Sequence, residues 1–485
     1  MSDPRETELK LQLAPEAAEA LRASGLLTGR ARTAEQHALY FDTPDHALAA
    51  AGLSLRIRRT GRTRIQTVKG SDGAAAGLFS RAEWEMRVRN DSPVIDDRTP
   101  LAEVLGGGAA RLAPVFAVAV TRRTWTLAHE GARIEAVVDK GEVSAADRRS
   151  PVGECELELL SGPPQALFDL ARRISATVPV SLGVLSKSER GYRLVGPLPQ
   201  AVKAEAVALM PDLTAAEAFG RIVASCLRQF RLNEDLLRAT RAAEPLHQAR
   251  VALRRLRSAL TIFRSMLGDH GAALREELRW LAGELGEARD LDVLSARAPD
   301  GPLRDRLRTA REAAHDRVAD ALSSGRTRGL MLDLAEWVAV GDWRTDPATA
   351  DRRAMDARTF AAEALSRFRR KVRRGGRDLA GQHDESRHDL RKDAKKLRYA
   401  ADFFDTLFQD SHRKARRRFA AALADFQDRM GELNDLAAAP MVLDRLGLGH
   451  LPEARALVAD ADRAALVAAA QEAHDRLAGA RAYWT

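Results

Sequence analysis

The sequence predicts an α+β protein of several domains, with an N-terminal antiparallel β domain flanked by helices and an all-α C-terminal domain. Before about residue 200, short segments alternate between apolar and polar residues and are bounded by Gly, Pro or Asp. This alternation is typical of β-strands. After that point Ala, Leu, Arg and Glu dominate, and apolar residues recur at spacings of three and four, which is typical of packed helices. The 485 residues are enough for two to four domains of roughly 150 residues.

The charge balance indicates a polyanionic partner for the C-terminal part. Lys and Arg number 77 against 68 Asp and Glu, which gives a net charge of +9. Residues 1–200 hold 27 basic and 25 acidic side chains, whereas residues 201–485 hold 50 and 43. The basic excess therefore lies mainly after residue 200, where it favours binding of an anionic polymer.

Cysteine usage and hydropathy exclude several classes of protein. The two cysteines, Cys155 and Cys226, have no CxxC or Cys/His spacing, which excludes a disulfide framework and a thiolate zinc site. The N-terminal residues MSDPRETELK have no apolar stretch, so we expect no signal peptide. No segment approaches the ~20 consecutive apolar residues of a membrane helix. We therefore expect a cytoplasmic protein with no membrane partner.

The β domain is expected to contain strands at each alternating segment. These segments cover residues 6–13, 52–60, 64–70, 81–89, 116–127, 133–143 and 154–160. Two helical stretches interrupt them, at about residues 15–24 and 164–176. The second stretch follows Gly162 and opens with Pro163 and Pro164, which suit a helix start. The domain is predicted to span residues 1–198.

The helical domain contains an internal repeat. The segment GPLPQ at 196–200 predicts a linker over 199–214, and the helical domain then covers 215–485. The segment HQARVALRRLR at 247–257 recurs as HDLRKDAKKLR at 388–398, and LGEARDLDVL at 285–294 recurs as MGELNDLAAA at 430–439. Because both pairs keep the same order and nearly the same offset, the sequence predicts a duplicated helical bundle, with copies at 215–340 and 356–485.

Several predicted strands carry charged side chains on one face. Alternation places these residues together in four groups: Glu6, Glu8 and Lys10; Arg56 and Arg58; Glu83, Glu85 and Arg87; Glu154, Glu156 and Glu158. One such strand is typical of a solvated face, but four with clustered acids and bases suggest charged faces that converge inside a barrel. Convergent carboxylates require cations between them, and convergent bases require an anion. A multivalent phosphate with bridging Mg²⁺ or Mn²⁺ satisfies both sets.

The ordered motifs resemble the CYTH domain family, the triphosphate tunnel metalloenzymes. The first strand carries EXEXK at Glu6, Glu8 and Lys10. The later matches, in order, are Arg56/Arg58, Lys69, Glu83/Glu85, Arg122/Arg123, Asp139, the E-x-E-x-E strand that ends at Glu158, and Ser186-Lys187. The resemblance covers residues 1–195 and implies a closed eight-stranded antiparallel tunnel that hydrolyses a linear triphosphate.

The resemblance also implies roles for individual residues. The implied metal ligands are Glu6, Glu8, Asp139, Glu156 and Glu158, supported by Glu83 and Glu154. The implied phosphate-binding residues are Lys10, Arg56, Arg58, Lys69, Lys187 and either Arg122 or Arg123, since alternation leaves only one of these two inside. The implied nucleophile is a water activated by Mg²⁺ or Mn²⁺, with Glu156 and Glu158 helping to remove its proton. Lys10 or Lys69 would stabilise the leaving phosphate.

Both copies of the helical repeat carry a basic stripe. His247, Arg250, Arg254 and Arg257 lie at i, i+3, i+7 and i+10, so they share one helix face. His388, Arg391, Lys395 and Arg398 do the same in the second copy. Like charges on one face destabilise an isolated helix, so we interpret the stripes as anion-binding surfaces rather than as solvated faces.

The repeated motif H-x-x-R-x-x-x-[RK]-[RK]-L-R resembles the CHAD domain family over residues 215–485. That family implies two four-helix bundles related by pseudo-two-fold symmetry, with a basic surface for inorganic polyphosphate. The implied contact residues are Arg250, Arg254, Arg255, Arg257, Arg391, Lys392, Lys395, Lys396 and Arg398, with Arg413, Lys414, Arg416 and Arg417 as an extension. For His247 and His388 we favour anchoring or hydrogen bonding to phosphate over metal chelation, because neither has an HxxxH or HxxE partner on its own helix.

The expected function is metal-dependent hydrolysis of inorganic triphosphate, with polyphosphate binding by the helical domain. Association with polyphosphate granules is a further expectation. The alternatives are a non-catalytic polyphosphate-binding or targeting protein, a thiamine triphosphatase and, in third place, an adenylate cyclase. Nucleic acid is disfavoured as the polyanion, because the chain has no recognisable helix-turn-helix and only 5% aromatic residues.

Overall fold

The computed structural model describes residues 5–70, 77–409, 412–459 and 463–484. The chain divides into two compact units. The first unit comprises Met1–Val202 and Ser323–Gly341, and the second comprises Lys203–Leu322 and Asp342–Thr485. Within the described residues, no helix is both long and apolar enough to span a membrane.

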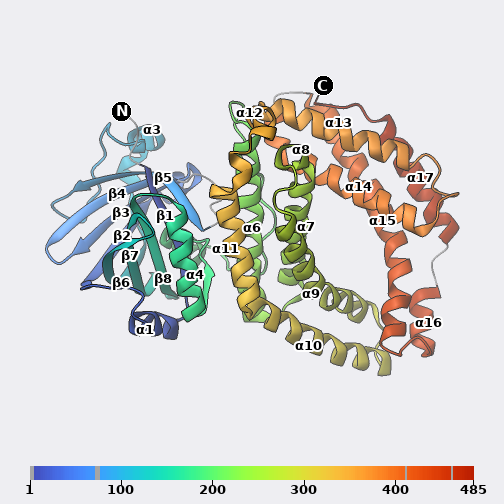
Figure 1. Cartoon of the computed structure of the whole chain (residues 1–485), viewed down its shortest axis with the longest axis horizontal. Helices are drawn as coiled ribbons and strands as arrows, with labels where there is room; N and C mark the ends of the chain where they lie inside the picture. The colour runs from blue at the N-terminus through green and yellow to red at the C-terminus, as the bar shows by residue number, and fades with distance from the viewer. Residues whose placement is uncertain (1–4, 71–76, 410–411, 460–462, 485) are drawn as a thin grey trace. The chain divides into compact units, whose positions relative to one another are not determined.

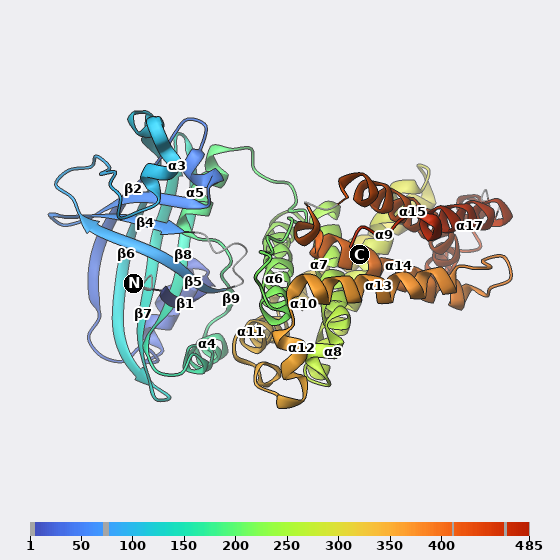
Figure 2. The ribbon, with the colours of Figure 1, turned by 90° about the horizontal axis from the view of Figure 1, so that it is seen from above.

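The first unit is built on one antiparallel sheet that curls on itself (Figures 1 and 2). Its strands are β1 (Arg5–Leu13), β2 (Arg32–Asp42), β3 (Leu53–Thr60), β4 (Thr63–Gly70), β5 (Leu78–Arg87), β6 (Ala113–His129), β7 (Ala132–Ala145), β8 (Arg148–Ser161) and β9 (Val180–Leu182). The order is β5-β4-β3-β2-β6-β7-β8-β1-β9, and an additional β5–β1 pairing closes the curl. The predicted antiparallel β domain is therefore confirmed, with a short ninth strand at the edge.

Helices pack on both faces of this sheet. They are α1 (Pro15–Ala23), α2 (Ala47–Ala50), α3 (Leu101–Leu105), the 3₁₀ helix η1 (Gly106–Arg111), α4 (Gln165–Thr177), α5 (Lys187–Val195) and α11 (Gly325–Val340). Apolar side chains of β2, β3 and β4 form a buried cluster with α2 and α3, and a second cluster joins β2, β6, β7 and β8 to α5. The apolar residues of β3 and β4 therefore point outward under α2 and α3, and alternation turns Arg56, Arg58 and Lys69 inward. The cluster with α5 lies instead on the inner face, because Val120 of β6 comes two residues before Arg122 and Tyr40 lines the cavity.

The second unit is entirely helical in its described part, as predicted. Its long helices are α6 (Ala215–Thr240), α7 (Ala243–Ile262), α9 (Ala272–Arg297), α10 (Pro302–Ser323), α13 (Ala357–Gly375), α14 (Asp384–Phe403), α15 (Arg413–Arg445) and α17 (Arg463–Gly479). Shorter elements are α8 (Arg264–Leu267), η2 (Asp342–Arg344), η3 (Pro347–Thr349), α12 (Ala350–Ala354), η4 (Asp405–Phe408) and α16 (Pro452–Ala459). The two copies of the repeat occupy matching places, because α7 and α14 carry the basic motif while α9 and α15 carry the second motif.

A buried carboxyl group ties β2 to two helices. Asp42, which is 1% exposed, accepts backbone N–H groups of Thr43, Leu48 and Ala49 at 2.8–3.0 Å. Tyr192 of α5 donates its hydroxyl to Asp42 Oδ2 at 2.7 Å. Lys187, a predicted phosphate-binding residue, is the first residue of α5. The contact between Tyr192 and Asp42 therefore fixes the helix that carries Lys187.

We predict that Tyr192→Phe destabilises the first unit by about 1–2 kcal/mol, because it removes one hydrogen bond from a buried carboxyl group. Tyr399→Phe in α14 is the matched control, since the Tyr399 ring stacks on Phe403 and the substitution keeps that ring contact. Urea unfolding followed by circular dichroism measures both. Equal midpoints for the two variants would contradict the structural role of the Tyr192 hydroxyl.

Candidate active site

The inner face of the curled sheet surrounds a cavity of about 530 Å³. Six bases and six carboxylates line it: Lys10, Arg56, Arg58, Lys69, Arg122 and Lys187 with Glu8, Glu83, Glu85, Glu135, Glu156 and Glu158. The other lining residues are Tyr40, Ser54, Val137, Ser186 and Ser188. Desolvated charges are costly unless they are paired, so a wall of this composition indicates a site for a charged ligand.

Strand register arranges the acids of β1, β7 and β8 in neighbouring rows. Glu8 lies opposite Glu158, which lies opposite Glu135. Lys10 lies opposite Glu156 in the next row. Like charges directly opposite each other on one sheet face are destabilising. The row of three glutamates therefore needs a cation, either from the protein or from a ligand.

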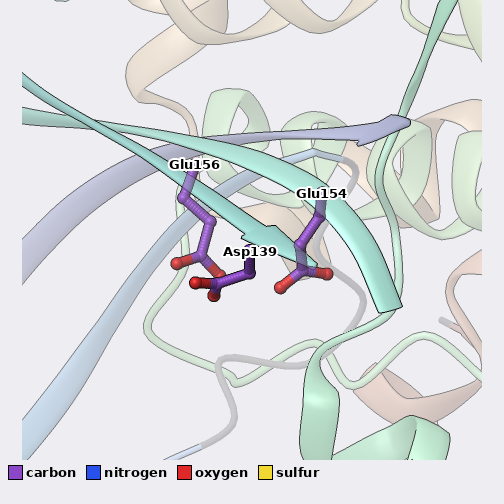
Figure 3. A group of neighbouring side chains, drawn as sticks. All are labelled: Asp139, Glu154 and Glu156. Atoms are coloured by element: carbon purple, nitrogen blue, oxygen red, sulfur yellow. The ribbon is translucent and has the colours of Figure 1, made fainter. Parts of the chain in front are cut away.

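The deepest part of the site is a network of three cations and three carboxylates. Asp139, Glu154 and Glu156 point toward one another from β7 and β8 (Figure 3). Lys10 Nζ lies 2.5 Å from Glu156 and 3.3 Å from Glu154, and Lys187 Nζ contacts Asp139 at 2.7 Å, Glu156 at 3.1 Å and also Glu154. Arg122 bonds Asp139 at 2.6 and 2.8 Å and Glu156 at 3.1 Å.

Mutual attraction sets the protonation states of this network. Burial alone would lower the pKa of Lys10 and of Lys187, but the neighbouring carboxylates outweigh it and raise both pKa values. Burial would raise the pKa of Glu156, but Lys10, Lys187 and Arg122 hold that pKa well below its ordinary value. The pKa of Asp139 is lowered against burial by Lys187 and Arg122. All of these groups are therefore charged at neutral pH.

The opposite wall, from β3, β4 and β5, holds further ion pairs. Lys69 Nζ lies 2.6 Å from Glu83, and Arg58 lies 3.3 Å from Glu85. Burial alone would lower the pKa of Arg56, but the interactions with Tyr40 and Glu83 outweigh this effect, so the pKa is raised. The Nε of Arg56 is buried with no hydrogen-bond partner among the described atoms. This wall therefore presents guanidinium and ammonium donors to the cavity.

The buried carboxylates fit a hard divalent cation. Asp139, Glu154 and Glu156 each offer an oxygen, and these oxygens lie within 4.8 Å of one another. The Oε2 atom of Glu154 is buried and lacks a hydrogen-bond partner in the described part of the chain. Carboxylate oxygens are the ligands that Mg²⁺ and Mn²⁺ prefer, so the donor set is suitable for either ion.

The basic stripes of the second unit lie on α7 and α14. On α7, burial lowers the pKa of His247, and the nearby charges of Arg289 and Arg254 lower it further. Arg250 has its pKa lowered by burial and then by Arg254 and Arg289, against the opposing charge of Asp290. The first copy is therefore a cluster of partly buried arginines.

The second copy is more nearly neutralised. Lys392 pairs with Asp389 at 3.0 Å, and Lys396 pairs with Asp393 at 2.8 Å. His388 Nδ1 lies 3.2 Å from Asn434 Oδ1 of α15, which joins the two helices. Arg416 of the predicted extension lies 3.3 Å from Asp405, whereas Arg413, Lys414 and Arg417 are exposed.

Comparisons with known proteins match both units. The CYTH domain family matches residues 4–192, and the CHAD domain family matches residues 221–444. A crystallised CHAD domain from the plant Ricinus communis is 31% identical with a TM-score of 0.50, and the match covers 98% of that chain and 58% of this one. The chain is a CYTH–CHAD protein.

Two curated relatives cover different shares of the chain. A Haemophilus influenzae protein named inorganic triphosphatase is 32% identical over 162 residues, which cover 32% of this chain and 44% of that protein. The match therefore spans less than half of the length of that relative. An uncharacterized protein of Mycobacterium tuberculosis, Rv2226, is 28% identical over 414 residues, which cover 76% of each chain.

The structure shows where five of the predicted site residues lie. Arg122 lines the CYTH cavity, whereas Arg123 lies on the outer face and contacts Glu19 of α1 at 3.4 Å, because adjacent strand residues face opposite ways. In the CHAD domain, Arg255 is only 4% exposed and lies over the Phe403 ring at 5.1 Å, so it packs rather than faces an anion. Lys392 and Lys396 form ion pairs with Asp389 and Asp393 of the same helix. The side chain of Glu6 lies outside the described residues.

The remaining predicted CYTH residues come together, and others join them. Asp139 and Glu154 are at most 1% exposed and lie behind the cavity wall rather than on it. Glu85, named above only as part of the Glu83/Glu85 motif, lines the cavity, and so do Glu135 and Tyr40, which were not predicted. Glu135 lies four residues before Asp139 on β7, so the alternation that turns Asp139 inward also turns Glu135 inward. This spacing was the sequence signal for Glu135. In the CHAD domain Arg289 joins the first stripe from a different helix, which spacing along α7 alone does not reveal.

We predict that Arg122→Met destabilises the CYTH unit by about 3 kcal/mol at pH 7, because it leaves buried carboxylates without a partner. Carboxylates with lowered pKa values stabilise the fold above their ordinary pKa of about 4 and lose that contribution as the pH falls. The difference between variant and wild type should therefore stay constant from pH 7 to about pH 5 and shrink as the pH falls from about 5 toward 2. Arg123→Met, the neighbouring control, should keep the wild-type midpoint. Urea unfolding across this pH range measures both, and a pH-independent difference would contradict the assignment.

Proposed function

We propose that the CYTH domain is a divalent-metal-dependent inorganic triphosphatase. The observation that supports this most is one cavity lined by six bases and six carboxylates. A pure anion-binding site gains little from carboxylates, and a pure metal site gains little from bases. A phosphate chain with bound metal needs both. The named relative from Haemophilus influenzae supports the same reaction.

Two groups of carboxylates are suited to hold metal ions. One is the buried set of Asp139, Glu154 and Glu156, and the other is the row of Glu8, Glu158 and Glu135 that lines the cavity. Mg²⁺ or Mn²⁺ bound there would neutralise phosphate charge and lower the pKa of a water. The bases Arg56, Arg58, Lys69 and Arg122 would bind and orient the phosphate chain.

The contacts divide the roles of the predicted catalytic residues. Glu156 is engaged by Lys10, Lys187 and Arg122, so it anchors these cations and is a poor acceptor for a further proton. We assign removal of the water proton to Glu158, which lines the cavity beside Glu8. Lys69, on the opposite wall, is placed to neutralise the leaving phosphate, because its side chain is 16% exposed beside Glu83, whereas Lys10 is 2% exposed between Glu154 and Glu156.

The lining favours inorganic triphosphate over thiamine triphosphate or a nucleotide. Besides the charged residues, the cavity presents Tyr40, Val137 and three serines. Tyr40 is 4% exposed and stacks on Phe116 at 4.6 Å, which leaves little of its ring for an organic base. A substrate that is entirely phosphate satisfies this wall without an apolar pocket.

We predict that Glu8→Gln lowers metal-dependent phosphate release by about 100-fold or more, because the amide keeps the shape but removes a charged oxygen ligand. Inorganic triphosphate, thiamine triphosphate and ATP are compared with Mg²⁺ or Mn²⁺. Glu16→Gln on the exposed face of α1 is the control and should match wild type. If wild type releases no phosphate from any of the three, the enzyme proposal fails.

We further propose that the CHAD stripes bind inorganic polyphosphate. The clustered arginines on α7 and α9 and the stripe on α14 support an extended anion that needs charge but no base recognition. The nitrogen atoms Arg250 Nη1 and Arg254 Nε are buried and have no hydrogen-bond partner in the described chain. A phosphate oxygen would give such donors the acceptor they lack.

We predict that Arg391→Ala with Lys395→Ala weakens polyphosphate binding and reduces the magnitude of the slope of log K against log [salt] by about 1.4, because each of the two lost phosphate contacts releases about 0.7 counterions on a single-stranded polyanion. Arg306→Ala with Arg308→Ala on α10, where both side chains are exposed, removes the same charge and is the control. Fluorescence anisotropy with a labelled polyphosphate measures both. Equal slopes for the two double variants would remove the α14 stripe from the binding surface.

A further inference from the structure

The shortest strand of the sheet supports the deepest part of the site. The N-terminal half of β1 pairs with β5, and its C-terminal half pairs with β9, where Leu11 lies opposite Leu182 and Leu13 opposite Val180. β9 has only three residues and is the last strand in the sheet order. A three-residue edge strand has few ladder hydrogen bonds, so its position depends on what packs against it.

The segment that follows β9 contacts Lys10 and carries Lys187, the two lysines of the buried network. Gly183 donates its N–H to Lys10 O at 2.8 Å, and a Cβ at this position would lie 2.7 Å from Lys10 Cγ, so glycine permits the close approach. Four residues later Lys187 Nζ contacts Asp139, Glu154 and Glu156. A displacement of β9 therefore moves Gly183, which packs against Lys10, and the backbone that carries Lys187.

The helix that packs on β9 comes from the CHAD sequence. α11 (Gly325–Val340) lies within the CHAD match at 221–444, yet it belongs to the same compact unit as the tunnel. It contacts α4 and β9. Arg172 of α4 donates to Asp333 of α11 at 2.9 and 3.3 Å and also bonds Glu336, while Asp169 of its own helix lies 3.7 Å away.

We propose that α11 is a positioning helix of the triphosphate site, and that Arg172 with Asp333 and Glu336 is the contact that holds it against α4 and β9. This role rests on the proposed triphosphatase function. It makes Arg172 a positioning residue, since its contacts are with α11 and with its own helix and its effect passes through β9 to Lys10 and Lys187. Small displacements far from the reacting atoms are enough to lower activity, by up to about 100-fold for 1 Å.

Charge reversal in the full-length protein tests this proposal. Arg172→Glu places a third acid beside Asp333 and Glu336 and should loosen α11. Arg173→Glu is the matched control, because Arg173 is the next residue of α4 and is exposed. The triple variant Arg172→Glu, Asp333→Arg, Glu336→Arg restores opposite charges and should restore the contact.

Two readouts separate positioning from loss of folded protein. Amide exchange of residues 180–187 should accelerate in Arg172→Glu alone and return toward wild type in the triple variant. The KM for triphosphate should rise about tenfold in Arg172→Glu and recover to within about twofold in the triple variant, because unfolded molecules lower kcat but leave the KM of the folded ones unchanged. Accelerated exchange with an unchanged KM, or unchanged exchange, overturns the proposal.

A milder variant and a binding assay keep the test decisive. If Arg172→Glu does not fold, Asp333→Asn with Glu336→Gln removes the same contact without adding an acid, and the same readouts apply. If wild type hydrolyses no triphosphate, the proposed function fails. Calorimetric binding of triphosphate with Mg²⁺ then replaces the KM, and an affinity that is equal in wild type and Arg172→Glu overturns the positioning role.

Discussion

The structure of the tunnel unit depends on burying three cations among three carboxylates. Removing Lys10, Lys187 and Arg122 from water is costly, and so is removing Asp139, Glu154 and Glu156. Each set is tolerable only because the other lies within 2.5–3.3 Å of it. A hydrophobic core of this volume would be as stable or more so. The network is therefore best explained by what the cavity in front of it must bind, and the apolar faces turned outward under α1–α4 are the consequence.

The fold and most of the site could be predicted because strand alternation is a strict rule. It places Glu8, Lys10, Arg56, Arg58 and Glu156 on the inner face without any knowledge of the partners. The same rule leaves Arg122 and Arg123 undecided, since neighbouring residues differ only in which way the strand faces. It also misses Tyr40, because the first half of β2 does not alternate cleanly. β9 could not be predicted, because three residues carry no periodicity and its position is set by β1 and α11.

The internal duplication preserves helix positions more closely than it preserves charge. His247 and His388 occupy the same place in the two copies, and each faces the same position of the second motif, Arg289 in one copy and Asn434 in the other. In the first copy this adds a cation to the stripe, while in the second it adds a neutral hydrogen-bond partner. The α14 copy also pairs Lys392 and Lys396 with acids of its own helix. The two stripes therefore present different charge densities on the same scaffold.

Sequence families and structural units do not coincide in this chain. The CHAD match includes α11, yet that helix packs on α4 and β9 of the tunnel, and both of its ends continue along the chain into the helical unit. An uncovered edge strand exposes unpaired backbone groups and is prone to mispairing. A tunnel that ended near residue 200 would leave β9 in that condition, immediately before the segment that carries Lys187. The helical sequence therefore covers β9, the short strand that pairs with β1, as well as carrying the basic stripes.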